Sequence, residues 1–153
     1  MAATLQEILL APDTRPLVID DCYTLIQREV SDNSGFRGTA VKVAYKTVIT
    51  FAPGHVRYMV EALLPDMVSK LEPYWADFNA SGGPAFGESA FGDYLTTRSE
   101  EVSQALLSVT DARAAASDRP TIIKAYRTVR GGAVKHVEAG LPRVGEMVLK
   151  YAV

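Results

Sequence analysis

Two tyrosines in this chain stand in matching surroundings. Tyr45 is followed by Lys46, and Tyr126 is followed by Arg127, so each phenol has a cation beside it in the sequence. A phenol next to a cation is a candidate for binding a small polar ligand or for acid–base work. The alternative is that both tyrosines are core aromatics whose hydroxyls reach the surface, and this structural role is the one that the sequence favours.

Two carboxylates are matched in the same way. Glu61 and Glu138 each lie four residues before a proline, Pro65 or Pro142, and proline has no amide hydrogen for the carbonyl four residues back. The paired residues together define a candidate ligand site: Tyr45, Tyr126, Glu61, Glu138, Lys46 and Arg127. The alternative is that both carboxylates are solvated and the prolines only set the angle at which helices pack. Duplicated sequence persists for packing as readily as for chemistry, so we favour the structural role.

These pairs belong to an internal repeat. The stretch Val60–Pro65, which reads Val-Glu-Ala-Leu-Leu-Pro, returns as Val137–Pro142 with one difference. Three matches in the same order indicate a duplication of the chain. The two further blocks match residues 44–48 with 125–129 and residues 67–71 with 147–151.

Composition bounds the class of protein. A chain of 153 residues with 48% hydrophobic and 22% charged residues fits one globular domain, residues 1–153. The net charge of −2 gives no global attraction to nucleic acid or to a membrane surface. The N-terminus lacks the basic region of a signal peptide, and no apolar run approaches the ~20 residues of a membrane span. We therefore expect a soluble cytoplasmic protein.

Cys22 is the single cysteine, so an intramolecular disulfide is excluded. It falls at helical spacing with Val18, Leu25 and Ile26, which predicts a buried small hydrophobic residue rather than a reactive thiol.

The apolar spacing predicts helices through the first half. Thr4–Glu7 matches a capping box, and a helix with Val18, Cys22 and Leu25 on one face ends before Gly35. A third helix is expected from about Thr39 to Phe51, although its Val, Thr and Ile content also suits a strand. A fourth begins at Pro53, and Pro65 either kinks it or opens a new helix.

The second half repeats this plan after a Gly-rich connector, residues 81–92. The connector carries Phe86 and Phe91, so we expect it to pack onto the bundle rather than to hang free. One long helix then runs from Tyr94 into residues 111–116, and Pro120 begins another that Gly131 and Gly132 end. The last helix crosses Pro142.

The expected fold is therefore all-α, a compact bundle of about six to seven helices. Its halves, about residues 15–80 and 89–153, each comprise three helices, the third of them interrupted by proline. Two such copies in one chain predict a pseudo-twofold arrangement.

Several kinds of site are absent from the sequence. His55 and His136 are not equivalent in the two copies, and no set of His, Cys or carboxylate residues has metal-ligand spacing, so neither a metal nor another cofactor is expected. The connector glycines match no phosphate-binding loop. Ser89 lacks the following glycine of a nucleophile elbow, because Phe91 takes that place.

Charge is unevenly distributed along the chain, and the second half carries a basic stripe. Lys124, Arg127 and Arg130 lie three residues apart on one predicted helix and would contact phosphates or an acidic partner. The alternative is a solvated helix face, which the negative total charge favours, so nucleic-acid binding is the weakest hypothesis.

Four stretches give the chain a resemblance to a known group of proteins. It resembles a family of small, uncharacterised, all-helical bacterial proteins, a resemblance that implies no activity, cofactor or site and agrees with a complete, stand-alone protein. The stretches are residues 5–12, Leu-Gln-Glu-Ile-Leu-Leu-Ala-Pro; 71–75, Leu-Glu-Pro-Tyr-Trp; 91–95, Phe-Gly-Asp-Tyr-Leu; and 110–113, Thr-Asp-Ala-Arg.

The sequence favours a non-enzymatic function. The first hypothesis is an interaction or assembly protein whose helix faces bind a second copy or another protein. The alternative is a small-ligand binder, or an enzyme, with a pocket between the two halves.

Overall fold

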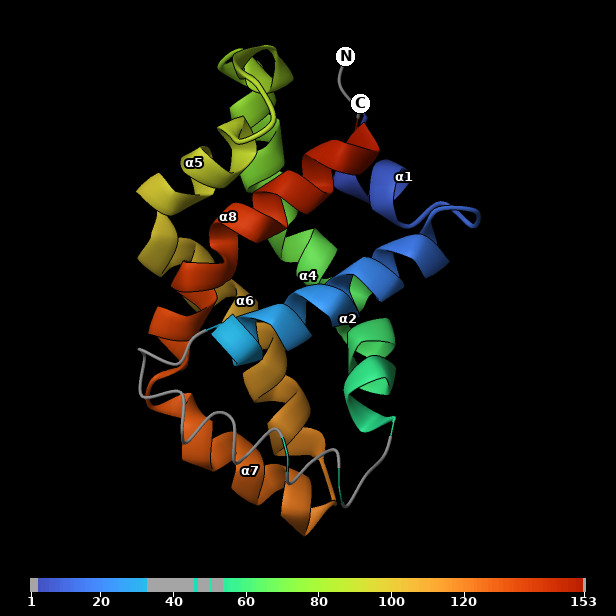
Figure 1. Cartoon of the computed structure of the whole chain (residues 1–153), viewed down its shortest axis with the longest axis vertical. Coiled ribbons are helices and arrows are strands. Elements are labelled where there is room, and N and C mark those ends of the chain that lie inside the picture. The colour runs from blue at the N-terminus through green and yellow to red at the C-terminus, as the bar shows by residue number, and fades with distance from the viewer. Residues whose placement is uncertain (1–2, 33–45, 47–49, 51–53, 153) are drawn as a thin grey trace.

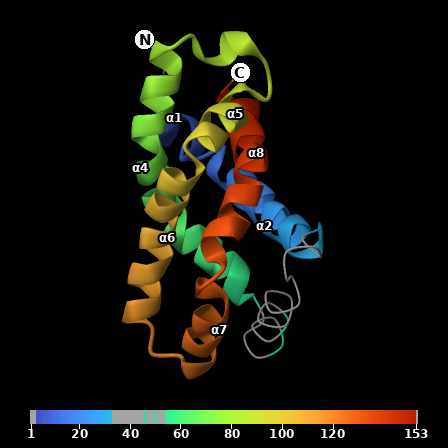
Figure 2. The same ribbon diagram turned by 90° about the vertical axis from the view of Figure 1, so that its left-hand side faces the viewer.

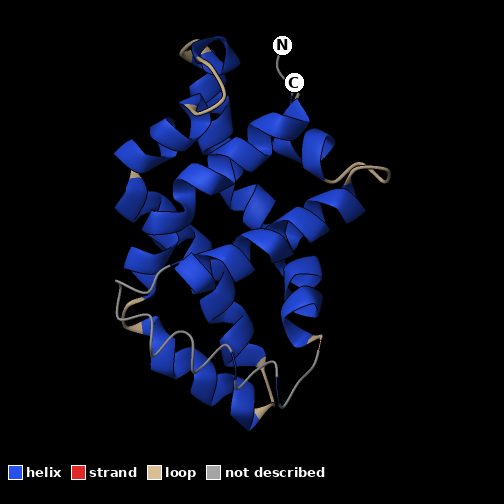
Figure 3. Cartoon of the chain, in the orientation of Figure 1, coloured by secondary structure: helices blue, strands red, loops and turns tan. Residues whose placement is uncertain are grey.

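The computed structural model of the chain describes residues 3–32, 46, 50 and 54–152. Over these residues it holds seven α-helices, a short 3-10 helix (Gly83–Phe86) and no strand (Figure 3). The prediction of an all-α fold is confirmed for this part of the chain. The element expected at residues 39–51 lies outside the described residues, apart from Lys46 and Thr50. The α-helices are α1 (Leu5–Leu9), α2 (Arg15–Asp32), α4 (His55–Ala80), α5 (Ala90–Thr97), α6 (Ser99–Ala116), α7 (Pro120–Arg130) and α8 (Ala133–Ala152).

Helix α4 is the longest helix described, and α6 runs beside it in the opposite direction. Tyr74 near the end of α4 bonds Glu101 near the start of α6, whereas Tyr58 near the start of α4 bonds Arg113 near the end of α6. Helices α2 and α8 cross α4 on the side that faces the viewer in Figure 1. The Gly-rich connector and α7 lie at opposite ends of the molecule (Figures 1 and 2).

The predicted capping box at the start of α1 is confirmed. The Thr4 hydroxyl accepts from the Glu7 amide at 3.1 Å, and the Glu7 carboxylate accepts from the Thr4 amide at 3.1 Å. The start of α1 is tied to α4, because the Trp75 indole donates to the Ala3 carbonyl at 2.8 Å. This short helix therefore depends on tertiary contacts as well as on its own cap.

The prolines do not interrupt their helices. Helix α4 continues through Pro65 and Pro73, and α8 continues through Pro142. Each proline frees the carbonyl four residues back, which in α4 belongs to Glu61 and Ser69. Both residues are exposed, where solvent has access to a freed carbonyl, and the buried face of α4 holds the helix together.

The second half differs from the expected three helices. The long helix predicted from Tyr94 to Ala116 is two helices, α5 and α6, which break at Arg98 with φ −123° and ψ 33°. The Thr97 hydroxyl donates to the Tyr94 carbonyl at 2.7 Å, which gives the last turn of α5 an alternative to helical hydrogen bonding. The described part of this half therefore holds α5, α6, α7 and α8.

An aromatic cluster fills the core at the connector end. The Phe91 ring lies 5.1 Å from Trp75, edge to face, and 5.0 Å from Phe78, while Tyr94 stacks on it at 6.2 Å. The two phenylalanines of the connector differ, since Phe91 is 0% exposed and Phe86 is 72% exposed. The prediction that the connector packs onto the bundle holds for Phe91 and is wrong for Phe86, whose ring lies over Gly82 instead.

Helices α5 and α8 approach each other backbone to backbone. A Cβ atom built on Gly145 would lie 2.1 Å from the amide nitrogen of Gly92, and one built on Gly92 would lie 2.9 Å from the Pro142 carbonyl oxygen. Only glycine permits such contact, because any side chain would separate the two helices.

Candidate functional site

A cavity of about 980 Å³ lies between α2, α4, α6, α7 and α8. Its longest wall is one face of α4, where apolar residues recur every three or four positions. The wall from His55 to Leu71 measures about 24 Å at the rise of an α-helix. The apolar α4 residues of this wall are Val56, Met59, Val60, Leu63, Leu64, Met67, Val68 and Leu71.

The other helices supply further apolar walls. Helix α8 supplies Val144, Met147 and Val148, and α6 supplies Leu106. Leu9 of α1 also lines the cavity, with the α2 residues Cys22, Leu25 and Ile26 and the α7 residues Ile122 and Ala125. Pockets of this volume, with a mostly apolar lining, are typical of small-molecule sites.

The polar residues of the cavity gather at one end. His55 and Tyr58 begin α4, and Arg113 stands opposite them near the end of α6. The segment 117–119, which joins α6 to α7, and Tyr126 of α7 also line the cavity. Because α4 and α6 run in opposite directions, these groups meet at the His55 end, and the Leu71 end is apolar. The cavity is therefore amphipathic along its length.

A cluster of hydrogen-bond donors occupies the polar end. Arg119 Nη1 lies 3.3 Å from His55 Nδ1, and Arg113 Nη2 donates to the Tyr58 hydroxyl at 3.1 Å with its guanidinium 5.7 Å from that ring. A guanidinium has hydrogen-bond donors and no acceptor, so His55 Nδ1 must accept the hydrogen bond and the imidazole proton lies on Nε2. Burial, with the charges of Arg119 and Arg113, lowers the pKa of His55 and keeps the ring neutral.

This cluster has surplus donors. His55 Nε2 is buried and has no hydrogen-bond partner among the described residues. Within the described part of the chain no carboxylate lies within ion-pair distance of Arg113 or Arg119, although the exposed Asp118 also lines the cavity. Two positive charges and a buried N–H donor thus lie at the polar end of a cavity whose remaining lining is mostly apolar.

Comparison with known proteins assigns the chain to a family. A family model described as a family of unknown function, DUF6918, matches residues 5–152. The chain belongs to this family. No curated protein and no solved structure matches it. The resemblance to an uncharacterised family is thus confirmed, and DUF6918 carries no function to this chain.

Of the paired residues singled out in this DUF6918 sequence, Tyr126 alone among the described ones lines the cavity. Tyr45 lies outside the described residues. Glu61 is exposed and lies off the lining face of α4, and Glu138 accepts a hydrogen bond from the Ser99 hydroxyl at 2.7 Å. Lys46 and Arg127 are exposed. The structure does not bring the described members of this set together, and their role in binding stays a prediction.

Tyr126 is held by a polar network at the edge of the cavity. Its hydroxyl donates to Asp111 Oδ1 and lies 2.8 Å from the Thr110 hydroxyl. Arg130 donates to both oxygens of Asp111, at 2.7 and 3.0 Å. Hydrogen bonds from Arg130 and Tyr126 lower the pKa of Asp111, while burial and the bond to Asp111 raise the pKa of Tyr126. The network fixes α7 against α6.

The same network bears on the basic stripe of the DUF6918 chain. Arg130 is engaged with Asp111, whereas Lys124 and Arg127 are exposed on α7. The hypothesis that this stripe binds nucleic acid stays a prediction, with one of its three cations already paired.

Cys22 behaves as a packing residue. Its thiol donates to the Met147 sulfur at 3.7 Å, and burial together with the charge of Asp21 raises its pKa to about 12. A thiol with so high a pKa is almost wholly protonated at neutral pH and is a poor nucleophile.

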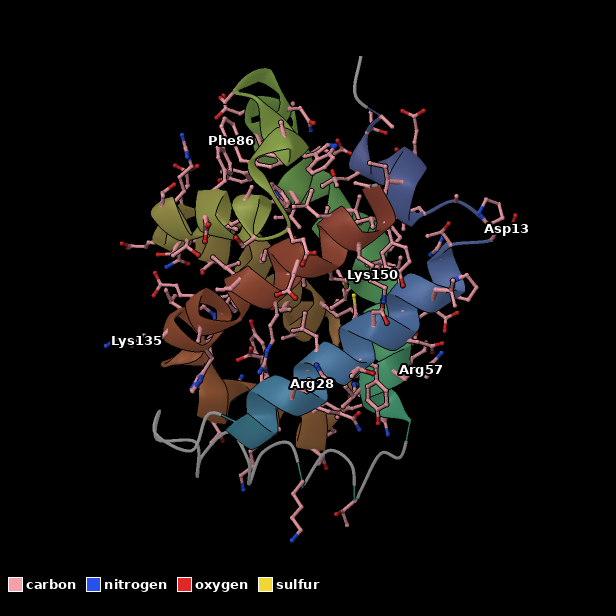
Figure 4. The ribbon with its side chains drawn as sticks, turned by 45° about the horizontal axis from the view of Figure 1, so that its top comes forward. Asp13, Arg28, Arg57, Phe86, Lys135 and Lys150 are labelled. Carbon is pink, nitrogen blue, oxygen red and sulfur yellow. The ribbon has the colours of Figure 1, made fainter. Side chains whose placement is uncertain are left out.

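A second hollow between α2 and α8 is charged. Figure 4 labels Arg28 on α2 and Lys150 on α8, which both line it. Lys150 donates to Asp21 at 2.8 Å, and Arg143 donates to Glu29 at 3.2 Å. Ion pairs as exposed as that of Lys150 contribute about 0–1 kcal/mol each, so we interpret this hollow as a charged surface feature rather than a ligand site.

Two kinds of feature are absent from the described residues. No group of three or more His, Cys, Asp or Glu side chains there is placed to hold a metal ion. None of the helices there is both long and apolar enough to cross a membrane.

The sequence patterns did not predict the residues that distinguish this cavity. Met59 and Met67 lie on an apolar face that reads equally well as core, and Arg113 and Arg119 belong to different elements. A weak signal existed, because three of the chain's four methionines, Met59, Met67 and Met147, line the cavity, and methionine suits adaptable apolar sites.

Proposed function

We propose that this protein binds an apolar small molecule in the cavity beside α4, without catalysis. The observation that carries the proposal is a mostly apolar lining of about 22 Å along one helix, from Val56 to Leu71, around a volume of about 980 Å³. The only thiol in the chain is held protonated, which favours binding over nucleophilic chemistry.

Titration with N-phenyl-1-naphthylamine tests this function, because the uncharged dye fluoresces only in apolar surroundings. We expect saturable binding of one dye molecule per chain. Val60 lines the middle of the cavity, so Val60→Trp should weaken binding by about tenfold or more by filling the space. Ala62→Trp places the same side chain on an exposed position of α4 and should leave the affinity unchanged.

Two controls distinguish a loss of dye binding from a loss of folding. Melting temperatures of both variants identify a misfolded protein, and Ala125→Phe, from the wall on α7, provides a second way to fill the cavity. Absence of saturable dye binding, or equal binding by both tryptophan variants, would reject the proposal.

Self-association is a second candidate function, and it is the one that the sequence alone favours. The observation in its favour is Phe86, a large aromatic residue that is 72% exposed in the connector. Sedimentation velocity should then show a concentration-dependent dimer that Phe86→Ser weakens, whereas a monomer at every concentration would exclude it. Both functions are proposed for a cytoplasmic protein.

The duplication is likewise proposed rather than observed. Its support is that α4 and α8 carry the repeated Val-Glu-Ala-x-Leu-Pro stretch and that both continue helically through its proline. Cross-links that join residues 60–71 and 137–151 to non-equivalent segments of the two halves would argue against a pseudo-twofold fold.

A further inference from the structure

The polar end of the cavity indicates which class of ligand it takes. An uncharged ligand would leave the half-buried Arg113 without a counter-charge from the described carboxylates, and it would leave the buried His55 Nε2 without an acceptor. Arg119 is exposed and adds positive charge beside them. A buried donor without a partner is costly, so a ligand that supplies an acceptor is favoured over one that does not.

The charge of that acceptor follows from the groups around it. Arg113 and Arg119 are cations with no carboxylate partner among the described residues, and His55 presents a neutral N–H. The N-terminal ends of α4 and α7 lie at this end of the cavity and add partial positive charge, which the C-terminal end of α6 offsets in part. Asp118 is the one acidic side chain in the described lining, and it is exposed. The balance at the polar end is positive.

The shape of the cavity fixes the remainder of the ligand. From Met59 to Leu71 the lining face of α4 carries no polar side chain, and the α8 residues of the lining are Val144, Met147 and Val148. An extended apolar chain fits such a wall, with its polar group held at one end only.

We propose that the cavity binds a single-chain carboxylate, with the carboxylate at His55, Arg113 and Arg119 and the alkyl chain along α4 toward Leu71. This inference rests on the proposed binding function and adds the head-group charge and the orientation. Arginine is suited to the role because its planar fork matches the two oxygens of a carboxylate.

The test is displacement of N-phenyl-1-naphthylamine by dodecanoate, dodecan-1-ol and dodecyltrimethylammonium, which share a chain and differ in head group. At pH 8 and below micelle-forming concentrations, we expect dodecanoate to bind wild-type protein about tenfold or more tightly than dodecan-1-ol, with the cation weakest. In the Arg113→Gln/Arg119→Gln variant, dodecanoate should bind no more tightly than the alcohol, while the dye and the alcohol bind as before.

Controls separate the head group from general charge and from folding. Arg57→Gln removes an exposed arginine of α4 that pairs with Asp20 and does not line the cavity, so it should keep the preference for dodecanoate. If the double variant has a lowered melting temperature, Arg119→Gln alone replaces it, because Arg119 is exposed.

The two proposals fail in different ways. Equal affinity for dodecanoate and dodecan-1-ol in the wild-type protein, or a preference that survives the loss of both arginines, would overturn the carboxylate assignment and leave the binding function intact. Failure of the wild-type protein to bind the dye or any of the amphiphiles would overturn both.

Discussion

Replacing Phe91 with alanine is expected to lower the free energy of unfolding by about 3–5 kcal/mol, as for other fully buried phenylalanines. Phe91 is 0% exposed and contacts the rings of Trp75, Phe78 and Tyr94. No neighbouring backbone is free to collapse into the space, because the next residue, Gly92, is already in contact with α8. Urea denaturation followed by the fluorescence of Trp75 measures the change.

The chain provides a matched control for this substitution. Phe86 occurs in the same Ala-Phe-Gly sequence five residues earlier and is 72% exposed, so Phe86→Ala should change the free energy of unfolding by no more than about 0.5 kcal/mol. Equal losses from the two substitutions would show that the aromatic cluster does not form the core at this end.

Replacing Gly145 with alanine is expected to destabilise the protein by about 2 kcal/mol or more, although alanine is the better helix former. The added methyl group would lie 2.1 Å from the Gly92 nitrogen and 2.3 Å from its Cα. These are backbone atoms, which cannot rotate away, so α5 and α8 must separate and the contacts between them are lost. Thermal unfolding followed by circular dichroism measures the loss.

Gly140 of the same helix is the control. A Cβ atom there would meet the Glu29 side chain at 3.6 Å, an ordinary contact, so Gly140→Ala gains helix propensity without a clash. We expect it to be neutral or to stabilise the protein by up to about 1 kcal/mol. A Gly145→Ala protein as stable as the Gly140→Ala protein would contradict the close crossing of α5 and α8.

The class of fold followed from the sequence because its signals are local. Each signal acts within one turn of the residues that carry it. Helix α1 begins after the capping box at Thr4, and α7 begins at Pro120 and ends at Arg130, before the two glycines. Proline does not end α4 or α8, so a new helix at Pro65 was the wrong alternative, because tertiary packing of a buried face outweighs one missing hydrogen bond. The helix break at Arg98 was missed since the apolar spacing continues across it.

The site was harder to predict, because it depends on which helices meet. The spacing of Met59, Leu63 and Met67 shows an apolar face, but the same face would serve a filled core or a cavity. Arg113 and Arg119 come together with His55 only because α4 and α6 run in opposite directions, a relation that no local pattern encodes. Gly92 and Gly145 are likewise far apart in the sequence and in contact in the structure.

The most direct test of the cavity as a binding site is an NMR titration of protein labelled with ¹³C at the methionine methyl groups. Met59, Met67 and Met147 line the cavity, and the aromatic rings of bound N-phenyl-1-naphthylamine would shift nearby methyl signals. If the dye binds in the cavity, signals of these methionines move and stop moving at one equivalent of dye. Dye fluorescence that saturates while all three signals keep their positions would place the dye elsewhere and contradict the proposed function.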